Sequence, residues 1–114
     1  MEILVEQRGP VTILRPQGDL KIGDGDVALR RAVQEQIQRG SRQIVLDLSR
    51  VAFMDSSGIG EIVASFKRVR RAGGEIKLSR PNPRVRETFG VTQLVRVLEI
   101  HEDEESAIAS FQGP

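Results

Sequence analysis

Two adjacent serine hydroxyls are the side chains of this sequence best placed to do chemistry. Ser56 and Ser57 follow Asp55 and precede Gly58. A short apolar run before them is typical of a buried strand, and the apolar residues after them recur with the period of a helix. We therefore expect the hydroxyls at a helix N-terminus, where unpaired N–H groups and the helix dipole stabilise an anion by about 0.3–1 kcal/mol.

A phosphate on one of these serines would act mainly on binding. It would add about −1.5 to −2 charges next to the carboxylate of Asp55, and this repulsion opposes the favourable helix dipole. We expect the fold to change little and a docking partner to be blocked. The simpler alternative is that Asp55-Ser56-Ser57-Gly58 is only a helix cap, since Ser and Asp are preferred there.

A hydrolase is the enzymatic alternative, with Ser56 or Ser57 as nucleophile and His101 as base. A nucleophile needs a positioned base and an oxyanion hole. His101 lies about 45 residues further along the chain, and a lone histidine is more often a surface residue by the usual geometric criteria. The sequence therefore favours a protein that is not an enzyme.

Two glycines in the first turn of the expected helix, Gly58 and Gly60, also require an explanation, because glycine is a poor helix former. Close approach of a partner's backbone or tight packing of the helix on the sheet would account for them.

Strands and helices alternate along the rest of the chain. Apolar runs bounded by Gly, Pro and Asp predict strands at Ile3–Glu6, Val11–Leu14, Gln43–Leu48, Glu75–Ser79 and Val97–Ile100. Helical spacing predicts helices over 26–39, about 58–72, 84–90 and after Glu102–Glu105, with a loop at Gln17–Gly25 and a turn at Thr92–Leu94. This order predicts an α/β fold, a mixed, mostly parallel sheet of about five strands covered by about four helices.

Composition limits the classes of function. The chain has 114 residues, so one domain over 1–114 is expected. Its net charge of +1 gives no broad attraction for nucleic acid, and no apolar run or basic leader predicts membrane insertion or secretion, so we expect a cytoplasmic protein. It has no cysteine and a single histidine, His101, so neither a metal nor a cofactor is predicted.

The stretch from Ile44 to Gly60, IVLDLSRVAFMDSSGIG, resembles the signature of STAS domains, in particular bacterial anti-sigma factor antagonists. The resemblance implies that Ser56 is phosphorylated by an anti-sigma factor that is also a serine kinase of the GHKL type. It implies that the unphosphorylated form binds this kinase and releases a sigma factor, and that a PP2C-type phosphatase resets the phosphorylated form. A STAS scaffold subunit that binds a transporter or lipid-trafficking partner without phosphorylation is the alternative.

The same resemblance implies a surface for the partner around Ser56. Its predicted residues are Asp19, Lys21, Asp55, Ser57, Gly58, Ile59 and Gly60. Lys21 departs from the family, in which many members carry an acidic residue in this loop. The kinase partner is therefore expected to differ from the usual one.

Overall fold

The computed structural model describes residues 1–90 and 96–112. The strands are β1 (Glu2–Arg8), β2 (Val11–Leu20), β3 (Gln43–Asp47), β4 (Val51–Met54), β5 (Glu75–Ser79) and β6 (Ile100–His101). The helices are α1 (Gly25–Gln38), α2 (Ser56–Arg71), α3 (Pro83–Gly90) and α4 (Glu104–Ser110). The expected turn at Thr92–Leu94 lies outside the described ranges.

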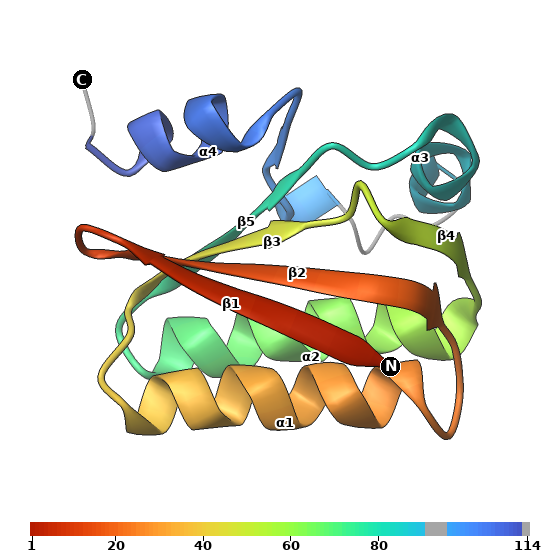
Figure 1. The fold of residues 1–114 in the computed structure, drawn as a ribbon, viewed down its shortest axis with the longest axis horizontal. Coiled ribbons are helices and arrows are strands. Elements are labelled where there is room, and N and C mark those ends of the chain that lie inside the picture. The colour runs from red at the N-terminus through yellow and green to blue at the C-terminus, as the bar shows by residue number, and fades with distance from the viewer. Residues whose placement is uncertain (91–95, 113–114) are drawn as a thin grey trace.

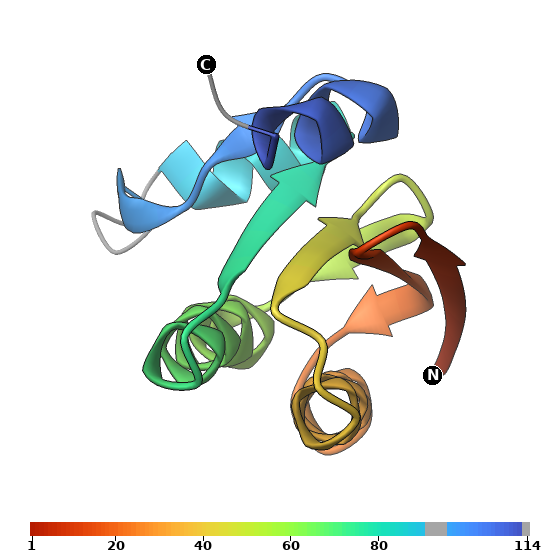
Figure 2. The same cartoon turned by 90° about the vertical axis from the view of Figure 1, so that its left-hand side faces the viewer.

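One six-stranded sheet forms the centre of the molecule, in the order β1-β2-β3-β5-β6, with β4 paired to β2. β1 is antiparallel to β2, and the other pairings are parallel. Helices α1 and α2 lie side by side against one face, and α4 covers the other face (Figures 1 and 2). The predicted mixed, mostly parallel α/β layer is confirmed.

β2 changes partner along its length. Its first part, Val11–Leu14, pairs with β3, and its last part pairs with β4 through Gly18 and Leu20. Pro16 lies between the two pairings, where its missing N–H removes no ladder hydrogen bond.

Three sequence expectations need correction here. β2 continues to Leu20, so the expected loop from Gln17 is wrong over its first four residues. β4 (Val51–Met54) was not among the expected strands. The last strand is Ile100–His101 instead of Val97–Ile100, because it pairs with β5 only at Leu78 and Ser79.

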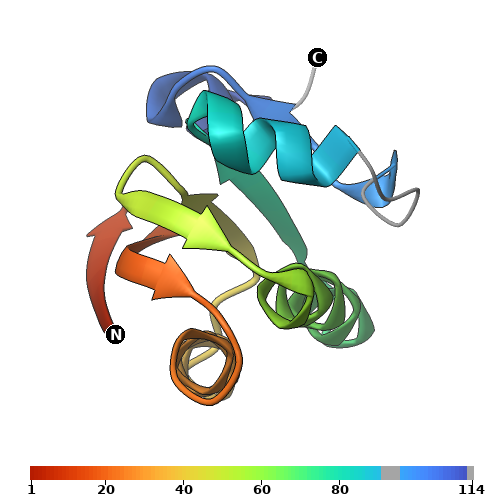
Figure 3. The same ribbon diagram turned by 90° about the vertical axis from the view of Figure 1, so that its right-hand side faces the viewer.

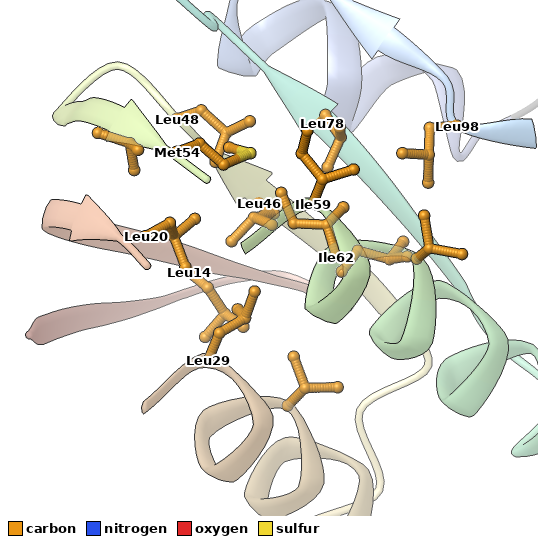
Figure 4. Close-up of a cluster of buried hydrophobic side chains, with 14 of the residues drawn as sticks. Leu14, Leu20, Leu29, Leu46, Leu48, Met54, Ile59, Ile62, Leu78 and Leu98 are labelled. Carbon is orange, nitrogen blue, oxygen red and sulfur yellow. The ribbon is translucent and has the colours of Figure 1, made fainter. Parts of the chain in front are cut away.

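The core is divided by the sheet into two parts. The larger cluster fills the space between the sheet and α1 and α2 and reaches α3; Figure 4 shows part of it, including Leu14, Leu20, Leu29, Leu46, Ile59 and Ile62. The smaller one lies under α4 and contains Val11, Ile13, Val45 and Ala107. Among the described residues, no helix is both long and apolar enough to cross a bilayer.

Candidate functional site

Asp55 is the N-cap of α2. Its backbone is extended, with φ −95° and ψ −176°, and its Oδ1 accepts a hydrogen bond from the Gly58 N–H at 2.9 Å. Its carbonyl accepts the first helical bond, from Ile59 N–H at 3.1 Å. The capping function thus belongs to the aspartate, and neither serine hydroxyl is required for it.

Ser56 is the first residue of α2 and is exposed, whereas Ser57 is half-buried. Figure 1 shows β4 leading into α2, and Ser56 follows the last residue of β4 by two positions. Its hydroxyl makes no hydrogen bond to another residue within 1–90 and 96–112. Ser56 is therefore accessible from solvent in the folded chain.

The loop after β2 is fastened to the cap of α2. The second carboxylate oxygen of Asp55, Oδ2, accepts from the Ile22 N–H at 3.1 Å, and the Asp55 N–H donates to the Leu20 carbonyl at 3.2 Å. On this loop Lys21 Nζ lies 3.8 Å from Asp19 Oδ2, and both side chains are at least partly exposed. Lys21 therefore belongs to the segment that is hydrogen-bonded to the residue before Ser56.

These hydrogen bonds keep the carboxylate of Asp55 ionised. The backbone N–H of Gly58 is the main cause that lowers the pKa of Asp55 below its ordinary value, and the N–H of Ile22 adds to it, against the opposing effect of burial. A phosphate on Ser56 would thus stand beside a fixed negative charge.

Gly58 and Gly60 differ in what surrounds them. A Cβ on Gly58 would lie 2.2 Å from the Leu20 carbonyl oxygen and 2.9 Å from Met54 Cγ, so only glycine fits. A Cβ on Gly60 would meet nothing within 4 Å. Close packing of α2 against the end of β2 explains Gly58. Gly60 is exposed and lies about one helical turn after Ser56.

The predicted partner-binding residues fall into two groups. Asp19, Asp55 and Ser57 are half-buried and Lys21 and Gly60 are exposed, but Gly58 and Ile59 are buried and offer almost no surface.

Sequence reasoning overlooked two exposed apolar residues near the cap. Ile22 is 71% exposed, and Phe53 is 36% exposed with the Arg84 guanidinium 5.4 Å from its ring centre. The available signal was an isoleucine in a polar loop and a phenylalanine two residues before the cap.

His101 takes part in a different contact. It lies on β6, and its Nε2 is 2.6 Å from Glu99 Oε2. In the described part of the chain the structure shows no hydrogen bond between His101 and either serine, so it supplies no arrangement of nucleophile and base.

Comparison with known proteins identifies the fold and the family. A model of the STAS domain matches residues 2–107. The anti-sigma F factor antagonist of Paenibacillus polymyxa is 32% identical over 113 residues, which cover 98% of this chain and 96% of that protein. A crystal structure from Thermotoga maritima, 27% identical, superposes with a TM-score of 0.88 over 96% of this chain and 94% of the other.

Two further structures show the same fold in both chemical states of one relative. The anti-sigma factor antagonist SpoIIAA in its unphosphorylated form gives a TM-score of 0.74 at 23% identity, covering 99% of this chain and 100% of that one. The phosphorylated form of Bacillus SpoIIAA gives 0.71 at 24% identity, covering 96% and 99%. With its family model, its full-length relative and its fold in agreement, this chain belongs to the STAS domain family.

Proposed function

We propose that this chain is an anti-sigma factor antagonist switched by phosphorylation of Ser56. The unphosphorylated form binds an anti-sigma factor that is also a GHKL-type serine kinase, and this binding releases a sigma factor. Phosphorylation ends the binding, and a PP2C-type phosphatase restores it. The names of the relatives support the antagonist role, and the resemblance of Ile44–Gly60 to the family signature supports the switch.

The observation that carries this proposal is that Asp55, and not Ser56, caps helix α2. Asp55 caps the helix through Gly58, and Ser56 is left exposed with an unengaged hydroxyl. If Ser56 were the cap, its modification would disturb the helix. As it stands, the hydroxyl can be modified while the cap persists.

The surroundings favour an effect on binding over an effect on the fold. The first turn of α2 is pressed against the Leu20 carbonyl at Gly58, and Asp55 also holds the Ile22 N–H. Added charge at Ser56 therefore has little freedom to move the helix. An unpaired phosphate buried in an interface costs several kcal/mol, and each 1.4 kcal/mol is a tenfold change in affinity.

The docking surface in this proposal consists of Ser56 and its exposed or half-exposed neighbours: Asp19, Lys21, Ile22, Phe53, Asp55, Ser57 and Gly60. Gly58 and Ile59 are buried beneath this surface and hold its backbone in place. Ile22 and Phe53 supply exposed apolar side chains that can serve as anchors, and a few anchor residues usually carry most of the binding energy of an interface.

In this proposal the chain is a substrate of a kinase and does not itself catalyse a reaction. The contact of His101 with Glu99 fits this assignment, because the histidine is engaged away from both serines.

Phosphorylation by the cognate kinase tests the proposal. Incubation with the kinase and ATP should add one phosphate, detected by intact-mass and peptide mass spectrometry. The phosphate should be absent from Ser56→Ala and retained in the matched variant Ser57→Ala. Modification that persists in Ser56→Ala would assign the phosphoacceptor to another residue and refute this part of the proposal.

A further inference from the structure

β1 is an open edge of the sheet. Within the described residues it pairs with β2 on one side and with no strand on the other, and Figures 2 and 3 show it as the outermost strand. All seven of its residues pair with β2 in unbroken register. Leu4 is 42% exposed and Val5 is 51% exposed. The strand contains no proline, lysine or bulge, so of the devices that usually protect a sheet edge it has only the charged side chains of Glu2, Glu6 and Arg8.

Hairpin geometry shows which backbone groups face outward. Gly9 and Pro10 form a two-residue turn, and Arg8 pairs with Val11 directly beside it. The closing pair of such a hairpin is hydrogen-bonded, so the even-numbered residues of β1 direct their N–H and C=O groups at β2. The odd-numbered residues, Ile3, Val5 and Gln7, direct theirs away from the sheet.

A second copy of β1 fits this edge in one register. In an antiparallel pair of β1 strands, the outward-facing groups can hydrogen-bond only if odd-numbered residues lie opposite odd-numbered residues. Three two-fold axes near the middle of the strand meet this condition, at Leu4, at Val5 and at Glu6. An axis at Leu4 places Glu2 opposite Glu6, and an axis at Glu6 places that carboxylate opposite its own copy. An axis at Val5 places Glu2 opposite Arg8 of the partner, twice.

We infer that this chain forms a two-fold dimer in which β1 pairs with β1 of a second copy about Val5. The two sheets then become one continuous sheet. Arg8 already pairs with Glu6 and Glu105 of its own chain, and in this register Glu2 of the partner joins that network at each end and fixes the register. The exposed side chains of Leu4 and Val5 are covered. Like-charge contacts disfavour the other two registers. A single pair of strands buries little area, so the dimer is a weak one, of the kind formed by interfaces below about 1,200 Å².

Charge exchange across the interface is the first test. Sedimentation equilibrium from about 10 to about 500 µM should show a monomer–dimer equilibrium. Glu2→Arg alone and Arg8→Glu alone should each weaken the dimer about tenfold, because attraction becomes repulsion at both pairs. An equimolar mixture of the two variants should recover the affinity as a heterodimer, since Arg at position 2 then faces Glu at position 8. The recovery also shows that both variants are folded.

Cross-linking tests the register itself. The natural chain has no cysteine, so Val5→Cys introduces a single thiol. At the two-fold axis the two Cα atoms would be about 5.5 Å apart, within disulfide reach, and mild oxidation should give a covalent dimer. Leu4→Cys is a matched control of similar exposure, but it faces Glu6 of the partner and should not cross-link. A chain that stays monomeric, or a dimer indifferent to these substitutions, would overturn the inference.

Discussion

Helices α2 and α4 have the same type of N-cap, but the residue that follows the cap differs in charge. Each has an extended aspartate as N-cap: Asp55 Oδ1 accepts from Gly58 N–H at 2.9 Å, and Asp103 Oδ1 accepts from Ser106 N–H at 2.7 Å. The residue after the cap is Ser56 in α2 and Glu104 in α4. One helix thus starts with a neutral hydroxyl and the other with a permanent carboxylate.

The carboxylate of α4 is anchored to the sheet. Arg15 holds Glu104 with two hydrogen bonds, Nε to Oε2 at 2.7 Å and Nη2 to Oε1 at 2.9 Å. Arg80 Nη2 lies 3.5 Å from Glu104 Oε2, and Arg80 Nε also binds the buried Asp47 at 2.9 Å. Among the described residues, no such cation engages Ser56. A constant charge at the start of α4 is thus used for attachment, whereas α2 starts with an exposed, uncharged hydroxyl.

The largest expected effect comes from giving α2 the charge that α4 has permanently. Ser56→Asp should weaken binding to the anti-sigma factor by about 100-fold or more, because an unpaired charge enters the interface. Isothermal titration calorimetry measures it. Ser106→Asp, an exposed serine in the first turn of α4, is the matched control and should bind as the natural chain does. Equal affinities for Ser56→Asp and the natural chain would contradict the blocking mechanism, provided the phosphorylated protein also binds.

The converse exchange makes α4 resemble α2. Glu104→Ser should lower the free energy of unfolding by about 2 kcal/mol, because it leaves the partly buried guanidinium of Arg15 with fewer acceptors. Ser56→Ala should change it by less than about 0.5 kcal/mol. Urea denaturation at pH 7 compares the two variants. Equal losses in the free energy of unfolding would show that Glu104 and Ser56 contribute equally to stability.

The cap that the two helices share can be tested at α2. Asp55→Ala should cost about 1 kcal/mol, since the Gly58 N–H loses its acceptor and the Ile22 N–H is released. Asp55→Asn keeps a capping oxygen and should cost less. Chemical denaturation gives the stabilities, and hydrogen exchange at Ile22 reports on the loop. Unchanged exchange at Ile22 in Asp55→Ala would show that the carboxylate does not hold the loop.

The smallest effect concerns pH. Because the pKa of Asp55 is lowered in the folded chain, mainly by the Gly58 N–H, its charge contributes stability above the ordinary pKa of about 3.9 and loses that contribution as pH falls through the lowered value. The difference in unfolding midpoint between the natural chain and Asp55→Asn should be constant from about pH 7 to 5 and shrink below about pH 4. A difference that grew on acidification would reverse the assigned direction of the pKa change.

The parts of the fold that the sequence predicted have strong local patterns. The apolar run Gln43–Leu48 and the helical spacing after Ile59 gave β3 and α2, and the signature between them located Ser56 at the junction that the structure shows. Both patterns arise because apolar side chains are buried, so they can be recognised in the sequence without knowing which elements pack together.

The parts it missed depend on contacts distant in sequence. Pro16 and Gly18 argue against a strand, yet β2 continues because β1 pairs with it as far as Gln17 and β4 pairs with it at Gly18 and Leu20. β4 itself is short, with Ala52 and Phe53 exposed, and it exists as a strand only through that pairing. The docking roles assigned to Gly58 and Ile59 could not be separated from those of their neighbours, because Gly58 is packed against the Leu20 carbonyl about 40 residues upstream and Ile59 belongs to the main core cluster.

The clearance at Gly58 sets a limit on how this surface can diversify. A Cβ at position 58 would lie 2.2 Å from the Leu20 carbonyl oxygen, so any residue other than glycine would force α2 away from β2. A Cβ at position 60 would meet nothing within 4 Å. In a saturation library of residues 55–60 selected for folding alone, position 58 should return only glycine and position 60 should vary widely. Relatives would then be able to change partners by varying the rim of the surface while its central residue stays constant.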